Sequence, residues 1–427
     1  MASVSTYPHI PEVLEEHAEE CAFVWQQRDD ALFAPDFDLP DLREWDSLLH
    51  AHVDGLFIGK EVALEKAMAL EGDFRGEWLV QARLLIARGE TSAFTDLLGA
   101  STTEPEFAKA VRSALGFAEP NELKGLVQHL LASEDKNAQL AGIAGCALHR
   151  VDPGPVLKSA ISSTDAALAT RSLKCVGELG LKVYGPDVEA RLSDPSPAVR
   201  FSAAKAATLL GLRTGLPVLK DVSVKDGSHQ REAMMLYTAV ADPEEVSSWL
   251  AQLANTETTV RLAMVGAGLT GDPRYLPALL DRMQISELAR VAGEAFEWIT
   301  GLYIYEASLE VIPEVAVPLP EDSMDWFEGD ELADDDDGVH PEDVNLVVPD
   351  IEKMLPWWDQ NKYRFETNTR YFCGMPVGPE ADTQLLRVGR QRYRHQAAFN
   401  LALRNPGQPL FDVRAPARRQ WRQLSNA

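Results

Sequence analysis

Several features that define common protein classes are missing from this sequence of 427 residues. No apolar run approaches the roughly 18 residues that a membrane-spanning helix needs, and the opening MASVSTYPHIPEVLEEH lacks the charged-then-apolar layout of a secretory signal. The four cysteines are scattered without C-x-x-C spacing, which predicts free buried thiols rather than a disulfide framework or a zinc site. We therefore expect a cytoplasmic protein without membrane insertion.

Motifs for nucleotide binding and hydrolysis are also lacking. The segment nearest to a Walker loop, Gly55 to Glu61, reads G-L-F-I-G-K-E, which has too few residues between the glycines and no Ser or Thr after the Lys. None of the nine histidines is followed by Glu, as a His-Glu metal pair would require. His17, His50 and His52 could meet across two helices, but a His on an apolar helical face is more often packed than metal-bound. We predict no catalytic residues, no metal and no cofactor.

Positive charge is scarce. The 40 Lys and Arg side chains stand against 66 Asp and Glu, so the net charge is -26. A field of this sign repels phosphate backbones and anionic lipids, which argues against nucleic acid as a partner unless a local basic patch overrides the average. The 45% apolar content nevertheless predicts that most of the chain folds.

A repeat of about 31 residues runs through the middle of the chain. Apolar residues mark one series with steps of 30 or 31: Leu126, Leu157, Val188, Leu219, Leu250 and Leu280. Arginines mark a second series, half a unit away, with steps of 29 to 31: Arg171, Arg200, Arg231, Arg261 and Arg290. Because two independent series share one period, this region is predicted to consist of helix-turn-helix units.

The clearest unit runs from Asp194 to Val222 and reads DPSPAVRFSAAKAATLLGLRTGLPVLKDV. The alanines at its centre favour a helix, and their small size lets neighbouring helices approach closely: they are Ala203, Ala204, Ala206 and Ala207. Gly211 and Gly215 predict the end of this helix. Cys146 and Cys175 are 29 residues apart, so we expect them in equivalent core positions of adjacent units.

The layout DPSPAVRFSAAKAATLLG at Asp194 to Gly211, with an echo at Val260 to Gly271, resembles the short HEAT-like repeat also found in phycobilin lyases. The resemblance implies an all-α fold, a right-handed α-solenoid of about seven HEAT-like (armadillo-type) helix pairs. It also implies that the Asp before the turn and the Arg after it form a ladder between units, here Asp194 with Arg200. Ligand binding by the arginine row remains the alternative.

The chain ends differ from the repeats. Apolar residues at helical spacing between 10 and 57 predict an antiparallel helix pair, bracketed by Pro35 and Pro40, that caps the array. Its outer face is expected to be acidic, because residues 1–54 hold thirteen Asp or Glu against Arg28 and Arg43 alone. The predicted parts are an N-terminal helical cap at 1–60, the repeats at 61–305, an irregular acidic segment at 306–352 and a C-terminal tail at 353–427.

The acidic segment cannot bury a core of its own. Val291 to Glu352 contains nineteen acidic residues and no Lys or Arg, which predicts a long loop or a disordered strap. A calcium loop of the EF-hand kind does not fit the register: with Gly338 at the sixth position, Ala333 stands first and Val344 last, where carboxylates are needed. A solvated segment is therefore favoured, and loose binding of a divalent ion by His340, Asp343 and Asp337 remains the alternative.

The charge reverses in the tail. From Arg387 to Arg422 there are nine arginines, one acid (Asp412) and no lysine, and arginine without lysine favours planar, bidentate contacts. These arginines are predicted either to dock on the acidic segment and acidic repeats of the same chain or to bind an acidic protein partner. The aromatic cluster before them either anchors the tail or forms a binding surface. The predicted partner-binding residues are Trp357, Trp358, Arg387, Arg390, Arg392, Arg394, Arg418 and Arg419.

The same region is similar to an uncharacterised proteobacterial family with HEAT-like repeats, often encoded beside type VI secretion genes. The motifs that carry this resemblance are WWDQN at Trp357 to Asn361, RYFCGMP at Arg370 to Pro376 and PGQPLFDVRAPARRQ at Pro406 to Gln420. The resemblance implies a bacterial secretion setting, with a secretion effector or apparatus component as a possible partner, and supplies no catalytic residues.

Together these features predict a non-catalytic protein-protein interaction scaffold: an adaptor, a chaperone or an immunity-type protein. A long concave surface of stacked helix pairs can bind another protein without requiring chemistry from any residue. The alternative is a lyase-like HEAT-repeat enzyme that acts on a bound protein or cofactor. Convergent polar side chains around a closed pocket would favour the enzyme, and an open groove would favour the binding protein.

Overall fold

The computed structural model describes residues 10–32, 34–312 and 340–425 of the chain. These residues form twenty-one α-helices and a single short β-hairpin, which confirms the all-α class. The central part of the predicted acidic strap, residues 313–339, lies outside the described residues.

The contacts divide the chain into two compact units. Unit 1 combines residues 1–240 with the C-terminal segment 382–427, and unit 2 comprises residues 241–381. One boundary falls inside the predicted repeat region and the other inside the predicted tail, so the C-terminal segment belongs with the first half of the chain rather than with the residues that precede it.

Unit 1 contains fifteen of the described helices and the end of one more, α19 (Pro379–Val388), which begins in unit 2. The fifteen are α1 (Pro11–Ala31), α2 (Leu39–Met68), α3 (Arg75–Arg88), α4 (Thr91–Ala100), α5 (Pro105–Phe117), α6 (Leu126–Ala132), α7 (Lys136–Leu148), α8 (Val156–Ile161), α9 (Ala166–Leu179), α10 (Gly185–Glu189), α11 (Pro197–Leu209), α12 (Leu216–Val222), α13 (Gln230–Val240), α20 (Gln391–Arg404) and α21 (Ala417–Ser425).

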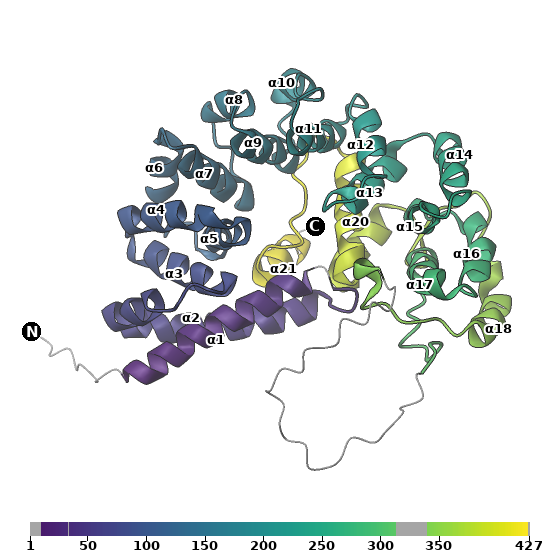
Figure 1. The fold of residues 1–427 in the computed structure, drawn as a ribbon, viewed down its shortest axis with the longest axis horizontal. Helices are drawn as coiled ribbons and strands as arrows, with labels where there is room; N and C mark the ends of the chain where they lie inside the picture. The colour runs from purple at the N-terminus through teal and green to yellow at the C-terminus, as the bar shows by residue number, and fades with distance from the viewer. Residues whose placement is uncertain (1–9, 33, 313–339, 426–427) are drawn as a thin grey trace, which may run out of the picture. The chain divides into compact units, whose positions relative to one another are not determined.

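The predicted N-terminal helix pair is present, since α1 packs along α2 (Figure 1). The chain between them contains Pro35, and α2 starts with Asp38 as its N-cap, whose carboxylate accepts a hydrogen bond from the Asp41 amide. The pair is longer than predicted because α2 resumes after a kink at Lys60, where φ is 48°, and continues to Met68.

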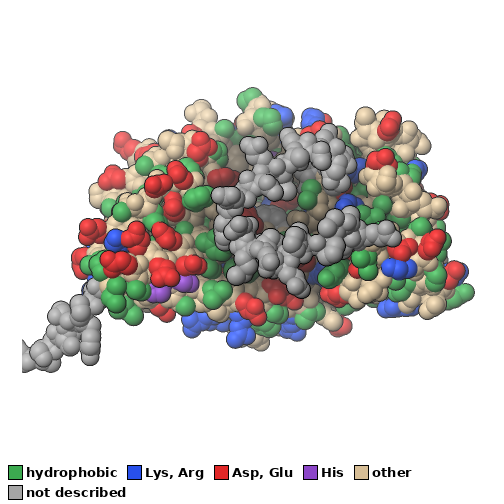
Figure 2. Space-filling view, turned by 60° about the horizontal axis from the view of Figure 1, so that its bottom comes forward, with side chains coloured by type: hydrophobic (Ala, Val, Ile, Leu, Met, Phe, Trp, Pro, Cys, Tyr) green, Lys and Arg blue, Asp and Glu red, His purple; other side chains and the backbone are tan. Residues whose placement is uncertain are grey.

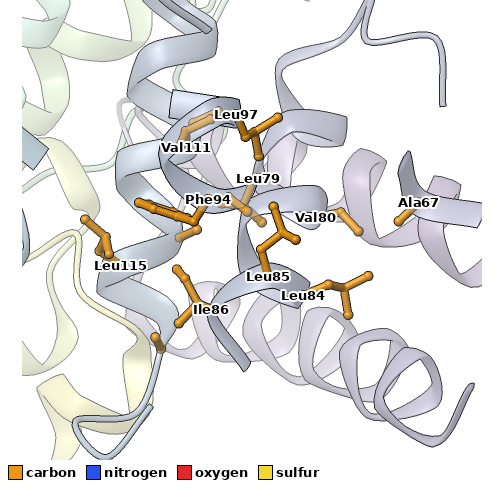
Figure 3. Close-up of a cluster of buried hydrophobic side chains, with 14 of the residues drawn as sticks. Ala67, Leu79, Val80, Leu84, Leu85, Ile86, Phe94, Leu97, Val111 and Leu115 are labelled. Atoms are coloured by element: carbon orange, nitrogen blue, oxygen red, sulfur yellow. The ribbon is translucent and has the colours of Figure 1, made fainter. Parts of the chain in front are cut away.

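The core beside this pair is built from α3, α4 and α5 (Figure 3). Leu79 and Leu85 from α3, Phe94 from α4, and Val111 and Leu115 from α5 are all buried. Burying side chains of this size stabilises the fold by about 1.5–3 kcal/mol each. The same cluster continues into α1 and α2, which joins the N-terminal pair to the helices that follow.

The two series of landmarks fall on alternate helices. The apolar series lies on the shorter helices α6, α8, α10 and α12 of unit 1, where its members are buried. The arginine series lies on the longer helices α9, α11 and α13. The longer helices pack side by side in sequence order, α3 on α5, α5 on α7, α7 on α9, α9 on α11 and α11 on α13. In Figure 1 they form the inner layer of unit 1, and the shorter helices form the outer one.

Small residues allow the close packing of the inner helices. A Cβ atom at Gly177 of α9 would lie 3.0 Å from the Cα of Ala206 in α11, so a larger residue would push these helices apart. Ala204 is fully buried, as predicted. Burial raises the pKa of Cys146 to about 11 and that of Cys175 to about 12, so both remain thiols that pack in α7 and α9.

The predicted pairing of Asp194 with Arg200 is wrong, because each side chain has other partners. Arg200 donates to the backbone oxygens of Asp194 and Pro195, at 2.6 and 3.0 Å. The carboxylate of Asp194 instead pairs with Arg191 at 2.9 Å. The arginine therefore closes its own turn rather than linking neighbouring units through side chains.

Unit 2 has its own core. Its elements are α14 (Pro243–Ala254), α15 (Val260–Thr270), α16 (Leu276–Arg282), α17 (Ser286–Thr300), α18 (Ile351–Asn361), β1 (Tyr371–Phe372), β2 (Met375–Pro376) and the start of α19. The antiparallel hairpin pairs Tyr371 with Pro376 and Phe372 with Met375. In this unit α15 packs on α14 and on α17.

Two members of the arginine series bind the described end of the acidic segment within unit 2. The Arg261 side chain pairs with Asp343 at 2.6 Å and with Glu342 at 3.2 Å. Arg290 donates to the backbone oxygen of Leu346. The arginine row is thus used structurally here, with acidic-segment residues as its partners.

Acidic side chains are spread over the surface of Figure 2, most densely on the left. No helix among the described residues is long and apolar enough to cross a membrane.

Candidate partner-binding site

The C-terminal segment lies against the inner helices of unit 1 (Figure 1). Helix α20 packs on α11 and α13, and α21 packs on α2. The segment therefore contacts both the N-terminal helix pair and the last of the longer helices of this unit. Between them the chain passes so close to α9 that a Cβ atom at Gly180 would lie 2.5 Å from the carbonyl carbon of Gly407. Gly180 also has φ of +67°, which a side chain would disfavour.

A buried ion pair in the N-terminal helices holds this segment. The Nε atom of Arg28 lies 2.6 Å from the Oδ1 atom of Asp46, and both side chains are almost fully buried. Arg28 also donates to the backbone oxygens of Arg414 and Ala415, while Asp46 accepts from the amide of Ala417. Both charges are therefore paired with each other and hydrogen-bonded to the C-terminal segment, which is what makes a buried pair tolerable.

Arg394 is inaccessible to a partner, which corrects its place among the predicted binding residues. Its side chain is fully buried, donates to the Leu386 backbone oxygen at 2.9 Å, and bonds to the side chains of Gln391 and Gln420. Burial lowers its pKa to about 9, with the nearby charge of Arg28 adding to the effect. Arg394 orients α19, α20 and α21 relative to one another.

Two other predicted arginines also bind backbone rather than carboxylates. Arg419 donates to the oxygens of Leu148 and Gly116, at 3.0 and 2.8 Å, and Arg387 donates to the oxygen of Leu424 at 2.8 Å. The segment thus docks within the chain, but carbonyl oxygens take the role that the sequence assigned to acidic residues. Arginine is suited to this because its donors fan out to several acceptors at once.

Two more predicted arginines lie at the N-terminus of α20, Arg390 as its N-cap and Arg392 in its first turn, and they do not line a common site. Arg390 reaches the oxygen of Pro35 at 3.4 Å, and Arg392 is half-buried in α20.

The two predicted tryptophans lie in unit 2, where they anchor α18. Their rings meet the ring of Phe296 in α17 edge-on, with centroids 5.8 Å away for Trp357 and 5.9 Å for Trp358. Both are half-buried by this packing. Edge-to-face aromatic pairs at such distances add to the free energy of burial. The anchoring alternative therefore describes these residues in this structure.

A groove of about 610 Å³ lies between α2 and α21 in unit 1. Each helix contributes residues at positions i, i+3, i+4 and i+7, which form one face of a helix. We call it the arginine groove, and its lining residues are Arg43, Asp46, Ser47 and His50 from α2 and Arg418, Trp421, Arg422 and Ser425 from α21.

The groove has three unpaired cations. The side chains of Arg43, Arg418 and Arg422 are exposed and make no hydrogen bond or ion pair with any part of the chain that the structure describes. Asp46, the sole carboxylate among the described lining residues, is already bound by Arg28 and by the Ala417 amide. The groove is therefore locally positive although the whole chain carries a net charge of -26.

The indole of Trp421 lies between the arginines of its helix and is half-buried. Its Nε1 atom is buried and has no acceptor among the described residues. A ligand in this groove would meet guanidinium donors on both walls beside an aromatic surface. That combination suits carboxylates, which guanidinium groups bind bidentately, and apolar side chains next to them.

Of the groove residues, only Arg418 was predicted. Arg43 was noticed in the sequence as one of two basic residues in an acidic region, and His50 as a possible metal ligand. In the structure His17 and His52 contact each other through their Nδ1 atoms at 3.1 Å, and His50 faces the groove. No group of three His, Cys, Asp or Glu able to hold a metal occurs among the described residues. The i, i+3, i+4, i+7 spacing on α21 was the sequence signal available for the rest.

Comparisons with known proteins add little to this geometry. No protein-family model matches the sequence, and no curated protein is similar to it. Among solved structures, the crystal structure of an engineered protein from the Northeast Structural Genomics Consortium is 15% identical, over 67% of this chain and 94% of that one, with a TM-score of 0.28. A likeness that weak supports no conclusion about fold or function.

Proposed function

We propose that this chain is a non-catalytic protein-protein interaction protein that binds an acidic segment of its partner in the arginine groove. The observation that carries the proposal is the convergence, on facing helices, of three arginines whose side chains have no hydrogen-bond or ion-pair partner among the described residues. Cations that pair with none of the described residues, on two facing helices, are available to an external anion.

An acidic partner can approach in spite of the overall negative charge. At physiological ionic strength charges separated by more than about 8 Å are largely screened, so the arginines of the groove dominate the field that a bound segment feels. Each exposed ion pair contributes about 0–1 kcal/mol, so the affinity depends on several pairs forming together.

The enzyme alternative would depend on His50 alone among the described lining residues, because Asp46, the other titratable candidate, is occupied. General acid-base catalysis needs a titratable group free to exchange a proton with the substrate. Asp46 is bound on both sides by Arg28 and the Ala417 amide.

For the fold, we propose that the alternating longer and shorter helices are HEAT-like repeats that form a right-handed α-solenoid. The side-by-side packing of α3, α5, α7, α9, α11 and α13 in sequence order supports this interpretation. The bacterial type VI secretion setting remains a proposal that rests on the sequence resemblance alone.

The experiment measures binding of a fluorescein-labelled oligo-glutamate peptide to the full chain by fluorescence polarisation. Wild-type protein is expected to bind, and Arg418→Ala and Arg422→Ala should each raise Kd by about 2–5-fold, the equivalent of about 0.4–1 kcal/mol. Lys158→Ala changes an exposed lysine of α8 that lies outside the groove and should leave Kd unchanged.

Two results would overturn the proposal. One is equal binding by the groove variants and by wild type. The other is tighter binding of a labelled single-stranded oligonucleotide than of the peptide, which would make the groove a nucleic-acid site instead.

A further inference from the structure

A second, larger cavity of about 690 Å³ lies in unit 1, lined by the inner helices α5, α7 and α9, by α1 and by the C-terminal segment. Figure 1 shows this segment passing along the inner side of those helices. The cavity shares none of the residues that line the arginine groove.

The lining of this cavity is strongly cationic. Among its described residues, seven are Lys or Arg: Arg28, Lys109, Arg112, Arg171, Lys174, Arg414 and Arg419. Three are acidic: Asp29, Glu106 and Asp412. This balance is opposite to that of the chain as a whole, with 40 basic against 66 acidic side chains.

Several of the cations are already neutralised within the chain. Lys109 pairs with Asp29 at 3.0 Å, and Arg171 pairs with Glu178. Asp412, the acid supplied by the C-terminal segment, lies 3.8 Å from Arg150. The acids in the cavity wall therefore have partners, and those partners do not include Arg112 or Lys174.

The side chains of Arg112 in α5 and Lys174 in α9 make no hydrogen bond or ion pair with any residue that the structure describes, although both are half-buried. Burial lowers the pKa of Arg112 to about 10, with the charge of Arg171 adding to the effect. Burial also lowers the pKa of Lys174 to about 8, helped by Lys205 and Arg171. A charge held in these surroundings without a counterion raises the free energy of the folded protein.

Further donors in the wall lack acceptors. The hydroxyl of Thr170 and the Nε atom of Arg171 are buried and have no hydrogen-bond partner in the described part of the chain. Both residues lie on α9 beside Lys174. Most of the remaining wall is apolar, with Trp25, Phe117 and Leu140 among its residues, and Ser113, Ser228 and His229 add polar groups. Unsatisfied donors next to apolar surface are the lining that a small organic anion requires.

We propose that this cavity binds a small organic anion, whose phosphate or carboxylate group lies between Arg112 and Lys174 and whose apolar body packs against the aromatic and aliphatic wall. The anion supplies the counterion that Arg112 and Lys174 lack among the described residues. The cavity volume falls within the roughly 300–1,000 Å³ of typical small-molecule sites.

The test is isothermal titration calorimetry of the full chain with four probes: naphthyl phosphate, naphthoate, inorganic phosphate and uncharged naphthol. Naphthyl phosphate or naphthoate should bind more tightly than the other two, because only these probes combine a negative charge with an apolar ring. The tighter of the two identifies the anionic group for which the cavity is built.

Lys174→Met and Arg112→Met should each weaken binding of that probe at least tenfold, since a hydrogen bond to a charged group contributes about 1.5–3 kcal/mol. Lys158→Met is the matched control, and the groove variant Arg418→Ala should also bind like wild type. The control and the groove variant separate this inference from the proposed function, because the two sites share no residue.

The inference is overturned if neither naphthyl anion binds, if naphthol binds as tightly as the anions, or if both cavity variants bind like wild type. Far-ultraviolet circular dichroism of each variant verifies that it is folded before titration.

Discussion

Replacing Lys174 by methionine should make the ligand-free protein more stable, although it removes a charged residue from the wall of the cavity. Lys174 has no ion-pair partner among the described residues, and burial together with neighbouring cations lowers its pKa from 10.5 to about 8. Each pKa unit corresponds to about 1.4 kcal/mol, so the charged ammonium costs at most about 3 kcal/mol in the folded state. Methionine keeps the apolar stem and removes this cost.

The sign of the pH dependence follows from the direction of the shift. The folded-state pKa is the lower of the two, so the full cost is present below pH 8 and is relieved as pH rises from about 8 to about 10.5. The advantage of Lys174→Met should therefore shrink from up to about 3 kcal/mol at pH 7 to about half that value at pH 9.5.

Urea unfolding followed by circular dichroism at both pH values measures this difference. Lys158→Met, at an exposed position of α8, is the control and should match wild type at both. A destabilised Lys174→Met protein, or a gain in stability that does not change with pH, would mean that the Lys174 ammonium has a counterion in the folded chain. The claim that it lies unpaired in the cavity would then be wrong.

Three further substitutions test other parts of the structure. Lys205→Met should lower the free energy of unfolding by about 1–3 kcal/mol in urea titrations, because it removes the ion pair in which Lys205 lies 2.6 Å from Glu232. Burial alone would raise the pKa of Glu232, but Lys205 holds it at about 2. The stabilisation is therefore present above the ordinary pKa of 4.5 and should be lost as pH falls towards 2. Ala204→Glu should lower the urea midpoint strongly, since it places an unpaired charge at a fully buried site in α11, and an unchanged midpoint would contradict the close packing there. Arg28→Met should speed hydrogen exchange of residues 410–417, whereas about 1 M salt should not, because buried arginine-carbonyl bonds rather than exposed ion pairs hold the segment. Faster exchange in salt, with no effect of the substitution, would show that exposed ion pairs hold it instead. Arg43→Met is the control at an exposed arginine.

The helical class and the order of the helices could be predicted because both depend on local patterns. The 31-residue spacing of Leu157, Val188 and Leu219 follows from helices of similar length that each bury one apolar face, and such periodicity is visible in a single sequence.

The docking of the C-terminal segment could not be predicted in the same way. Arg28 and Ala415 are 387 positions apart, and no periodicity connects them. The charges of the sequence suggested acidic partners for the arginines, but Arg419 binds the backbone oxygens of Leu148 and Gly116. Every residue has a backbone oxygen, so the sequence does not show which of them accept hydrogen bonds from an arginine. The separation of buried Arg394 from exposed Arg418 likewise depends on which face of α20 or α21 meets its neighbour.

The arginine groove shows the same limit. Its two walls are helix faces that can each be read from spacing, Arg43 to His50 and Arg418 to Ser425, but only the packing of α2 on α21 brings them together. Their common positive charge becomes significant once the structure shows that Asp46, which lies between them, is bound by Arg28.

Hydrogen-deuterium exchange of the full chain with and without oligo-glutamate is the measurement that tests the central claim most directly. The proposed binding in the arginine groove predicts that residues 43–50 and 418–425 become protected together when the peptide is added, and that the same peptide concentration protects them less in Arg418→Ala/Arg422→Ala. Protection confined to other segments, or equal protection of these two in the double variant, would contradict it.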